Sequence, residues 1–127
     1  MGRDDIEISA RAIAQAGSPE YTTHAGATLE RLAELAGRGD LEALSTTFVA
    51  HVAVHPRDER RLVAAVPKMV LSRYLHGFAG LEFPAVERWR ARTPDWAALL
   101  GSALHDPRRF AAVAAAIVVE VGLPAEA

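Results

Sequence analysis

The chain has 127 residues, of which 50% are hydrophobic and 24% charged, with a formal net charge of −2 and no cysteine. This length and apolar content exclude a mainly disordered chain and predict one domain over residues 1–127 with a buried core. The absence of cysteine excludes disulfides, thiolate metal sites and cysteine nucleophiles. Alanine (26 residues) and arginine (13 residues) are abundant, which is typical of coding in a GC-rich bacterium.

Charge is distributed unevenly along the sequence. Residues 1–42 carry a net charge of −4, residues 43–56 none, residues 57–92 carry +4, and residues 93–127 carry −2. Such a chain can pair with a second copy, or its own acidic and basic helices can meet on folding. The longest apolar run, residues 110–119, is shorter than the roughly 20 residues that cross a membrane. No signal peptide is evident, so we expect a cytoplasmic protein that does not enter a membrane.

The N-terminal third of the sequence predicts two helices. The first covers about residues 5–15, with Asp4 or Asp5 as its cap, and a glycine follows it as a stop. The second covers residues 21–36 and has Pro19 at its first turn, where a missing N–H costs nothing. Apolar residues recur at helical spacing in both segments.

The next segment is ambiguous between helix and strand. Asp40 is a good N-cap for a helix that begins at Leu41, but residues 45–55 are rich in β-branched residues and alternate as a strand does. No turn residue separates this stretch from the helical residues before it. We therefore predict a helix to about Val54, stopped by Pro56.

The second half of the sequence predicts further short helices. One opens near residue 57 and is expected to kink or break at Pro67, because proline removes a backbone donor. Gly77 and Gly80 are then expected to form a loop. Later helix starts follow the proline-containing pairs Phe83-Pro84, Thr93-Pro94 and Asp106-Pro107. The sequence therefore predicts an all-α fold, a single compact bundle of six to seven short helices.

The last predicted helix has an unusual composition. Residues 110–119 are apolar on every side, whereas a surface helix needs only one apolar stripe. We expect this C-terminal helix to be central in the bundle or to form a dimer interface. It should then be the most buried element of the molecule or of its dimer.

His51 and His55 stand four residues apart, so on a helix they share one face and can chelate a metal. The glutamate that zinc peptidases place beside the first histidine is missing, since Val52 occupies that position. The candidate ligand-binding set consists of these two histidines with His76, Arg73 and Trp89. A metal site stays open at this point and needs the fold to bring in His105, Asp58, Glu59 or Asp106. No catalytic residue and no cofactor are predicted.

Three arginines flank a tryptophan in the second half of the chain. Arg88, Arg90 and Arg92 beside Trp89 are a candidate patch for phosphate or for a partner. The alternative is a solvated face that pairs with Glu87. Sequence-specific DNA recognition is not expected, because no helix–turn–helix pattern with a basic second helix is present.

One segment resembles a known family. Residues 39–44, then Phe48, then residues 52–56 are similar to the helix-to-first-strand segment of the nuclear-transport-factor-like (SnoaL-like) α+β cone family. The resemblance implies a cone-shaped pocket with His51 or His55 near it, and activity as a small-molecule isomerase or cyclase. It covers about eighteen residues. Residues 57–127 depart from the pattern, because they lack the alternating strands of that fold.

These features favour a small cytoplasmic helical protein that acts by protein–protein interaction or regulation and associates with itself or another protein. Enzyme activity is not favoured, because no catalytic constellation is present. One alternative is a helical protein, including an enzyme, that binds a metal or small molecule around His51 and His55. Others are a phosphate or nucleic-acid binder, although nucleic acid is not the expected partner, and the α+β cone enzyme.

Overall fold

The computed structural model describes residues 19–122, and every regular element within them is helical. The elements are α2 (Pro19–Arg38), α3 (Leu41–Val54), the 3₁₀ turn η1 (Pro56–Asp58), α4 (Glu59–Met69), the π-helix η2 (Val70–Phe78), α5 (Phe83–Arg92), α6 (Trp96–Ala103) and α7 (Pro107–Gly122). The predicted all-α bundle is confirmed. The predicted helix over residues 5–15 lies outside the described residues. None of the described helices has the length and apolar character to span a membrane.

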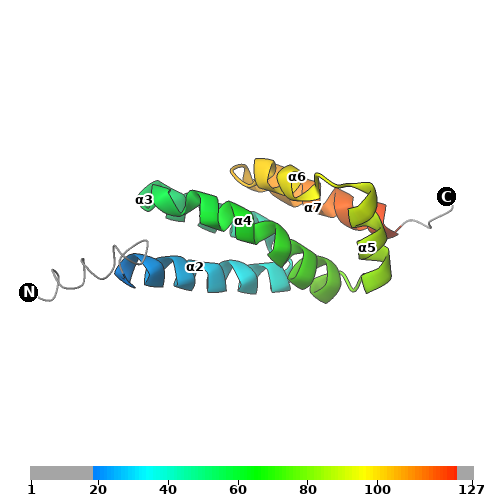
Figure 1. Ribbon diagram of the computed structural model, residues 1–127, viewed down its shortest axis with the longest axis horizontal. Helices are drawn as coiled ribbons and strands as arrows, with labels where there is room; N and C mark the ends of the chain where they lie inside the picture. The colour runs from blue at the N-terminus through cyan, green and yellow to red at the C-terminus, as the bar shows by residue number, and fades with distance from the viewer. Residues whose placement is uncertain (1–18, 123–127) are drawn as a thin grey trace, which may run out of the picture.

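The bundle has three layers (Figure 1). α2 forms one outer layer, α3 and α4 form the middle, and α6 and α7 form the other outer layer. α2 packs on α3, α4 and η2, while α7 packs on α3, α5 and α6. The core runs through all three layers, and its largest fully buried side chains include Trp89, Phe48 and Phe110. Contacts such as that of α3 with α7 therefore bring together distant parts of the sequence.

The ambiguous segment is a helix, so the alternative of an α+β cone is wrong. Asp40 caps α3 by accepting a hydrogen bond from the Ala43 backbone N–H (3.3 Å), which satisfies one of the free donors of the first turn. Leu41, Leu44 and Phe48 then lie at helical spacing and are all buried. The strand-like alternation is overridden because this spacing packs one face of α3 into the core.

The helix starts predicted at prolines are confirmed for α2 and α7, whereas α6 begins later than predicted. Asp106 accepts a hydrogen bond from the Arg109 N–H (3.2 Å), and α7 begins at Pro107 as predicted. α6 begins two residues after Pro94, because the Trp96 N–H bonds to the Thr93 carbonyl (3.0 Å) in a turn that precedes the helix.

The helix that contains Pro67 neither ends nor breaks there. α4 continues through the buried Pro67 and changes at Val70 into η2, a nine-residue π-helix. Wider hydrogen bonds follow, including Ala79 N–H to Tyr74 O at 2.8 Å. Gly77 therefore lies inside η2, and the expected loop is reduced to the residues around Gly80, whose φ is +68°.

The burial of α7 is one-sided within the described chain. Phe110, Ala114, Ile117 and Val121 are buried, and their spacing of four, three and four residues follows one stripe of the helix. The opposite side is exposed. The helix is thus apolar all round in sequence, but residues 19–122 of a single copy cover only one side of it.

Candidate functional site

An uncharged apolar surface covers the outward sides of α3 and α7, which pack against each other. We define the α3–α7 face by its exposed residues Val49, Ala50, Ala53, Ala112, Ala115, Ala116 and Val119. Val119 is 65% exposed, although valine is usually buried in folded proteins. Alanine side chains allow two helices to approach closely, so this face suits contact with another helix.

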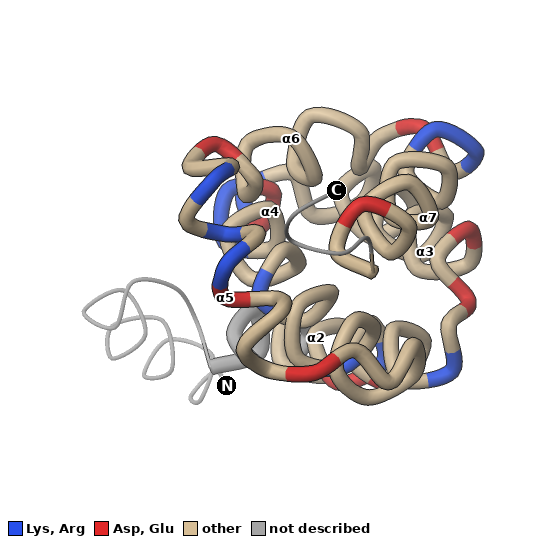
Figure 2. Tube along the Cα trace, turned by 90° about the vertical axis from the view of Figure 1, so that its right-hand side faces the viewer, with Lys and Arg blue, Asp and Glu red and all other residues tan. Residues whose placement is uncertain are grey.

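Charge is arranged around this face rather than on it. The stretch of α3 after Glu42 carries no Asp, Glu, Lys or Arg, and α7 has its charges at Arg108, Arg109 and Glu120, near its ends. In Figure 2, lysine and arginine positions gather on the side of α4 and α5. Exposed apolar residues on two helices that pack together are typical of an interaction site.

The second candidate is a buried network around His51. The His51 Nε2 atom lies 2.7 Å from Asp58 Oδ2, and Nδ1 lies 2.8 Å from the Thr28 hydroxyl. These three residues come from α2, α3 and η1, so the network joins three elements. The His51 and Asp58 side chains are only 7% and 2% exposed. The ring of His55 lies next to that of His51, with centroids 4.8 Å apart.

The chemistry of this network follows from its geometry. An ionised Asp58 carboxylate only accepts hydrogen bonds, so His51 donates through Nε2. In a neutral imidazole, Nδ1 then accepts the hydroxyl proton of Thr28. A hydroxyl, an imidazole and a carboxylate in this order resemble the relay of a hydrolase triad. Because the imidazole and carboxylate are shielded from water, the network primarily fixes the corner between α2, α3 and η1.

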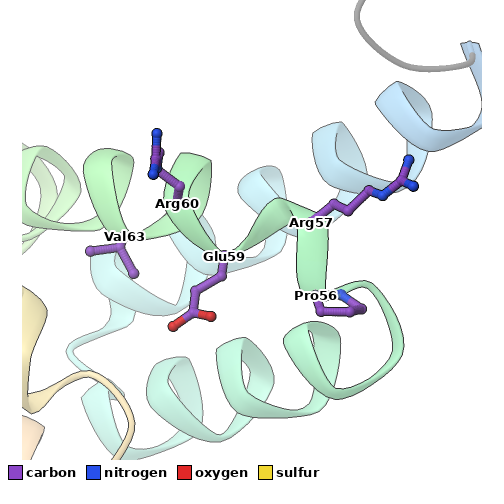
Figure 3. Close-up of a pocket in the computed structure, with 5 residues that line it drawn as sticks. All are labelled: Pro56, Arg57, Glu59, Arg60 and Val63. Carbon is purple, nitrogen blue, oxygen red and sulfur yellow. The ribbon is translucent and has the colours of Figure 1, made fainter. Parts of the chain in front are cut away.

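A second histidine–carboxylate pair lies at the same corner but is open to water. His105 Nε2 lies 2.9 Å from Glu59 Oε2, and the two side chains are 54% and 46% exposed. The His105 ring also contacts Phe48 edge-on, with centroids 5.0 Å apart. A pocket of about 420 Å³ opens beside this pair. It is lined by Pro56, Arg57, Glu59, Arg60 and Val63 (Figure 3).

The predicted ligand-binding set is divided between three parts of the fold. His51 and His55 lie together on α3, as their spacing predicts. Arg73 and His76 lie on η2, where the His76 ring stacks on Phe83 at 5.5 Å. Trp89 is fully buried in α5 and donates to Glu120 at 3.1 Å. Within residues 19–122, no three His, Asp or Glu side chains are placed to hold a metal ion.

The three arginines beside Trp89 are not equivalent. Arg90 pairs with Glu87 (3.1 Å) and lies over the Trp96 ring, 5.2 Å from its centroid, so its charge serves contacts within the bundle. Arg88 and Arg92 are exposed and form no ion pair with the described residues.

Sequence reasoning identified His51 but did not identify Thr28 as its partner. A threonine in the middle of α2 carries no signal of a tertiary contact, because the two residues are 23 positions apart. The α3–α7 face was indicated in part by the apolar run of residues 110–119. The contribution of α3 to this face depends on the packing of the two helices, which the sequence does not specify.

No protein-family model matches this chain, and neither a curated protein nor a solved structure is similar enough to it to indicate a function.

Proposed function

We propose that this protein is a helical interaction protein that self-associates through the α3–α7 face. The observation that carries the proposal is the exposed, uncharged surface that α3 and α7 share. Burying it removes apolar area from water, and the seven residues that define the face carry no charge to desolvate, both of which favour association.

A second copy of the chain is the partner that this face suits best. In a two-fold dimer the same surface meets itself, so like charges on the surface would oppose each other. The α3–α7 face has no formal charge and therefore no such repulsion. Its alanines permit close contact between two copies of α7, and Val49 and Val119 supply larger apolar side chains.

The test is the oligomeric state in solution, measured by sedimentation equilibrium over a wide concentration range. Wild-type protein is expected to shift from monomer to dimer as concentration rises. The double variant Ala112→Glu/Ala116→Glu places two carboxylates of each copy in the interface and is expected to weaken association by at least about 100-fold. Both positions are exposed in the monomer, so the fold is retained.

The matched control is Ala97→Glu/Ala98→Glu, which adds the same charge to exposed positions of α6, outside the face. This variant should associate as the wild type does. A wild-type protein that remains monomeric at every concentration would contradict self-association and leave a different protein as the partner. Equal weakening in both double variants would assign the effect to net charge and not to the face.

A further inference from the structure

The 3₁₀ turn η1 and the helix α4 that follows it carry four exposed cations. Arg60, Arg61 and Lys68 lie on α4, where the seven-residue spacing of Arg61 and Lys68 places these two on one face, and Arg57 lies in η1 directly before the helix. We call these four residues the α4 basic face. Along α4, Arg61 and Lys68 are separated by about 10 Å at the rise of an α-helix. None of the four forms an ion pair with the described residues.

The acids closest in sequence form no ion pair with this face. Asp58 is buried and bound to His51, and Glu59 is bound to His105. Figure 3 shows the Glu59 side chain directed to the opposite side of the helix from Arg60, with Arg57 directed away from both. Each of these two carboxylates is thus engaged by a histidine from another element, and the cations beside them remain without an acidic partner.

The acidic helix α2 does not neutralise the α4 basic face either. α2 packs against α4, but its Glu34 pairs with Arg31 at 2.7 Å and Arg38 at 3.1 Å, both on α2 itself. Among the described residues the expected meeting of acidic and basic helices therefore produces no ion pair between α2 and α4. The positive charge of α4 faces solvent.

We propose that the α4 basic face binds the phosphate backbone of a nucleic-acid duplex without reading its sequence. Four exposed cations on η1 and α4 complement the charge of the phosphates, and three of the four residues are arginines, which bind phosphate through two parallel hydrogen bonds. Binding of this kind needs no base contact, because it is driven by the release of counterions from the phosphates. It is independent of the α3–α7 face, which lies on another side of the bundle.

The chemistry of the face favours a duplex over a membrane or an acidic protein. The exposed position between the arginines and Lys68 is Ala64, and none of the large exposed apolar side chains of the described chain lies on α4. Lipid-binding helices add an apolar side that enters the bilayer, and protein interfaces centre on buried aromatic or aliphatic anchors. The α4 basic face offers charge alone.

The experiment measures binding of a fluorescently labelled duplex DNA of random sequence by anisotropy, as a function of salt. Four phosphate contacts predict a slope of log K against log salt of about −3.6, or roughly a 150-fold loss of affinity between about 50 and about 200 mM salt. The triple variant Arg57→Gln/Arg61→Gln/Lys68→Gln should make this slope shallower by about 3 and bind weakly at all salt concentrations.

The matched control is Arg31→Gln/Arg108→Gln/Arg109→Gln, which removes the same charge from exposed positions away from α4. It should keep the wild-type slope, and circular dichroism verifies that both variants are folded. Equal loss in the two triple variants, or no binding by the wild type at low salt, would overturn the proposal. Tighter binding to vesicles with anionic lipid or to poly-glutamate than to the duplex would overturn it as well.

Discussion

At the scale of single residues, the two histidine–carboxylate pairs differ chiefly in their exposure to water. His51 and Asp58 are almost fully shielded, whereas His105 and Glu59 are about half exposed. A hydrogen bond to a buried charge has no solvent to replace it when one partner is removed. An exposed pair is screened, and water takes over its bonds. The same pair of functional groups should therefore have unequal effects on stability.

We expect His51→Ala to lower the free energy of unfolding by about 2–3 kcal/mol at neutral pH, because Asp58 loses a short bond in a buried site. The matched variant His105→Ala should cost less than about 1 kcal/mol. Urea denaturation followed by circular dichroism measures both values. Similar losses in the two variants would show that the His51 network does not fix the corner between α2, α3 and η1.

Glu34 allows a residue-scale prediction about pH. The hydrogen bond from Arg31, together with the charge of Arg38, holds the pKa of this carboxyl below its ordinary value of 4.5. The stabilisation is therefore present above pH 4.5 and is lost as pH falls through the lowered pKa. Carbon-detected NMR titration should place the Glu34 midpoint below 4.5 and should move it upward in Arg31→Ala. An unchanged midpoint in that variant would contradict the assignment.

At the scale of elements, the junction between α2 and α3 depends on Gly39. Its φ is +76°, in the left-handed region that favours glycine, and the aromatic ring of Phe78 lies against its Cα. A Cβ added at Gly39 would come within 2.7 Å of three ring carbons of Phe78. The turn thus requires glycine both for its backbone conformation and for the approach of η2.

Two neighbouring glycines should respond to alanine with opposite signs. Gly39→Ala is expected to destabilise the protein by about 1–2 kcal/mol, because alanine is strained in the left-handed backbone conformation. This value does not include the additional cost of moving the Phe78 ring away from the new Cβ. Gly37→Ala, inside α2 and with open space around it, should stabilise by about 0.5–1 kcal/mol because alanine is the better helix former. Thermal unfolding distinguishes them. A Gly39→Ala variant as stable as the wild type would contradict this account of the junction.

Local signals predicted the elements better than the contacts between them. The cap at Asp40 and the stop at Pro56 predict α3 closely, because both act on the backbone within one turn. The π-helix after Pro67 was not predicted, since proline in a helix indicates a kink or a break and does not specify the wider hydrogen bonds that follow here. The hydrogen bond between His51 and Asp58 also requires the chain to reverse direction at η1. The separation of the two residues in the sequence does not predict that reversal.

At the scale of the whole molecule, the layers interlock the two halves of the chain. α3 packs on α7 and α4 packs on α6. The buried Ser45 hydroxyl donates to the carbonyl of Leu104 at 2.6 Å, a bond that spans 59 residues. Because both halves contribute to one core, we expect unfolding in a single cooperative step.

The tryptophans make this expectation testable. Trp89 and Trp96 lie in α5 and α6, so fluorescence reports on the C-terminal half, whereas circular dichroism reports on every helix. The two signals should give the same denaturation midpoint. A fluorescence transition at lower denaturant than the circular dichroism transition would indicate that the C-terminal half unfolds on its own.

The loop around Gly80 has a consequence for the continuity of the chain. It connects η2 to α5 and so joins residues 19–78 to the last three helices (Figure 1). A peptide cut there leaves Phe48 on one fragment and Phe110 on the other, although both belong to the same core. Neither fragment can bury its apolar face alone. The protein is in effect a complex of two complementary pieces on one chain, so a version nicked at Gly80 should hold together and its separated fragments should reassemble on mixing.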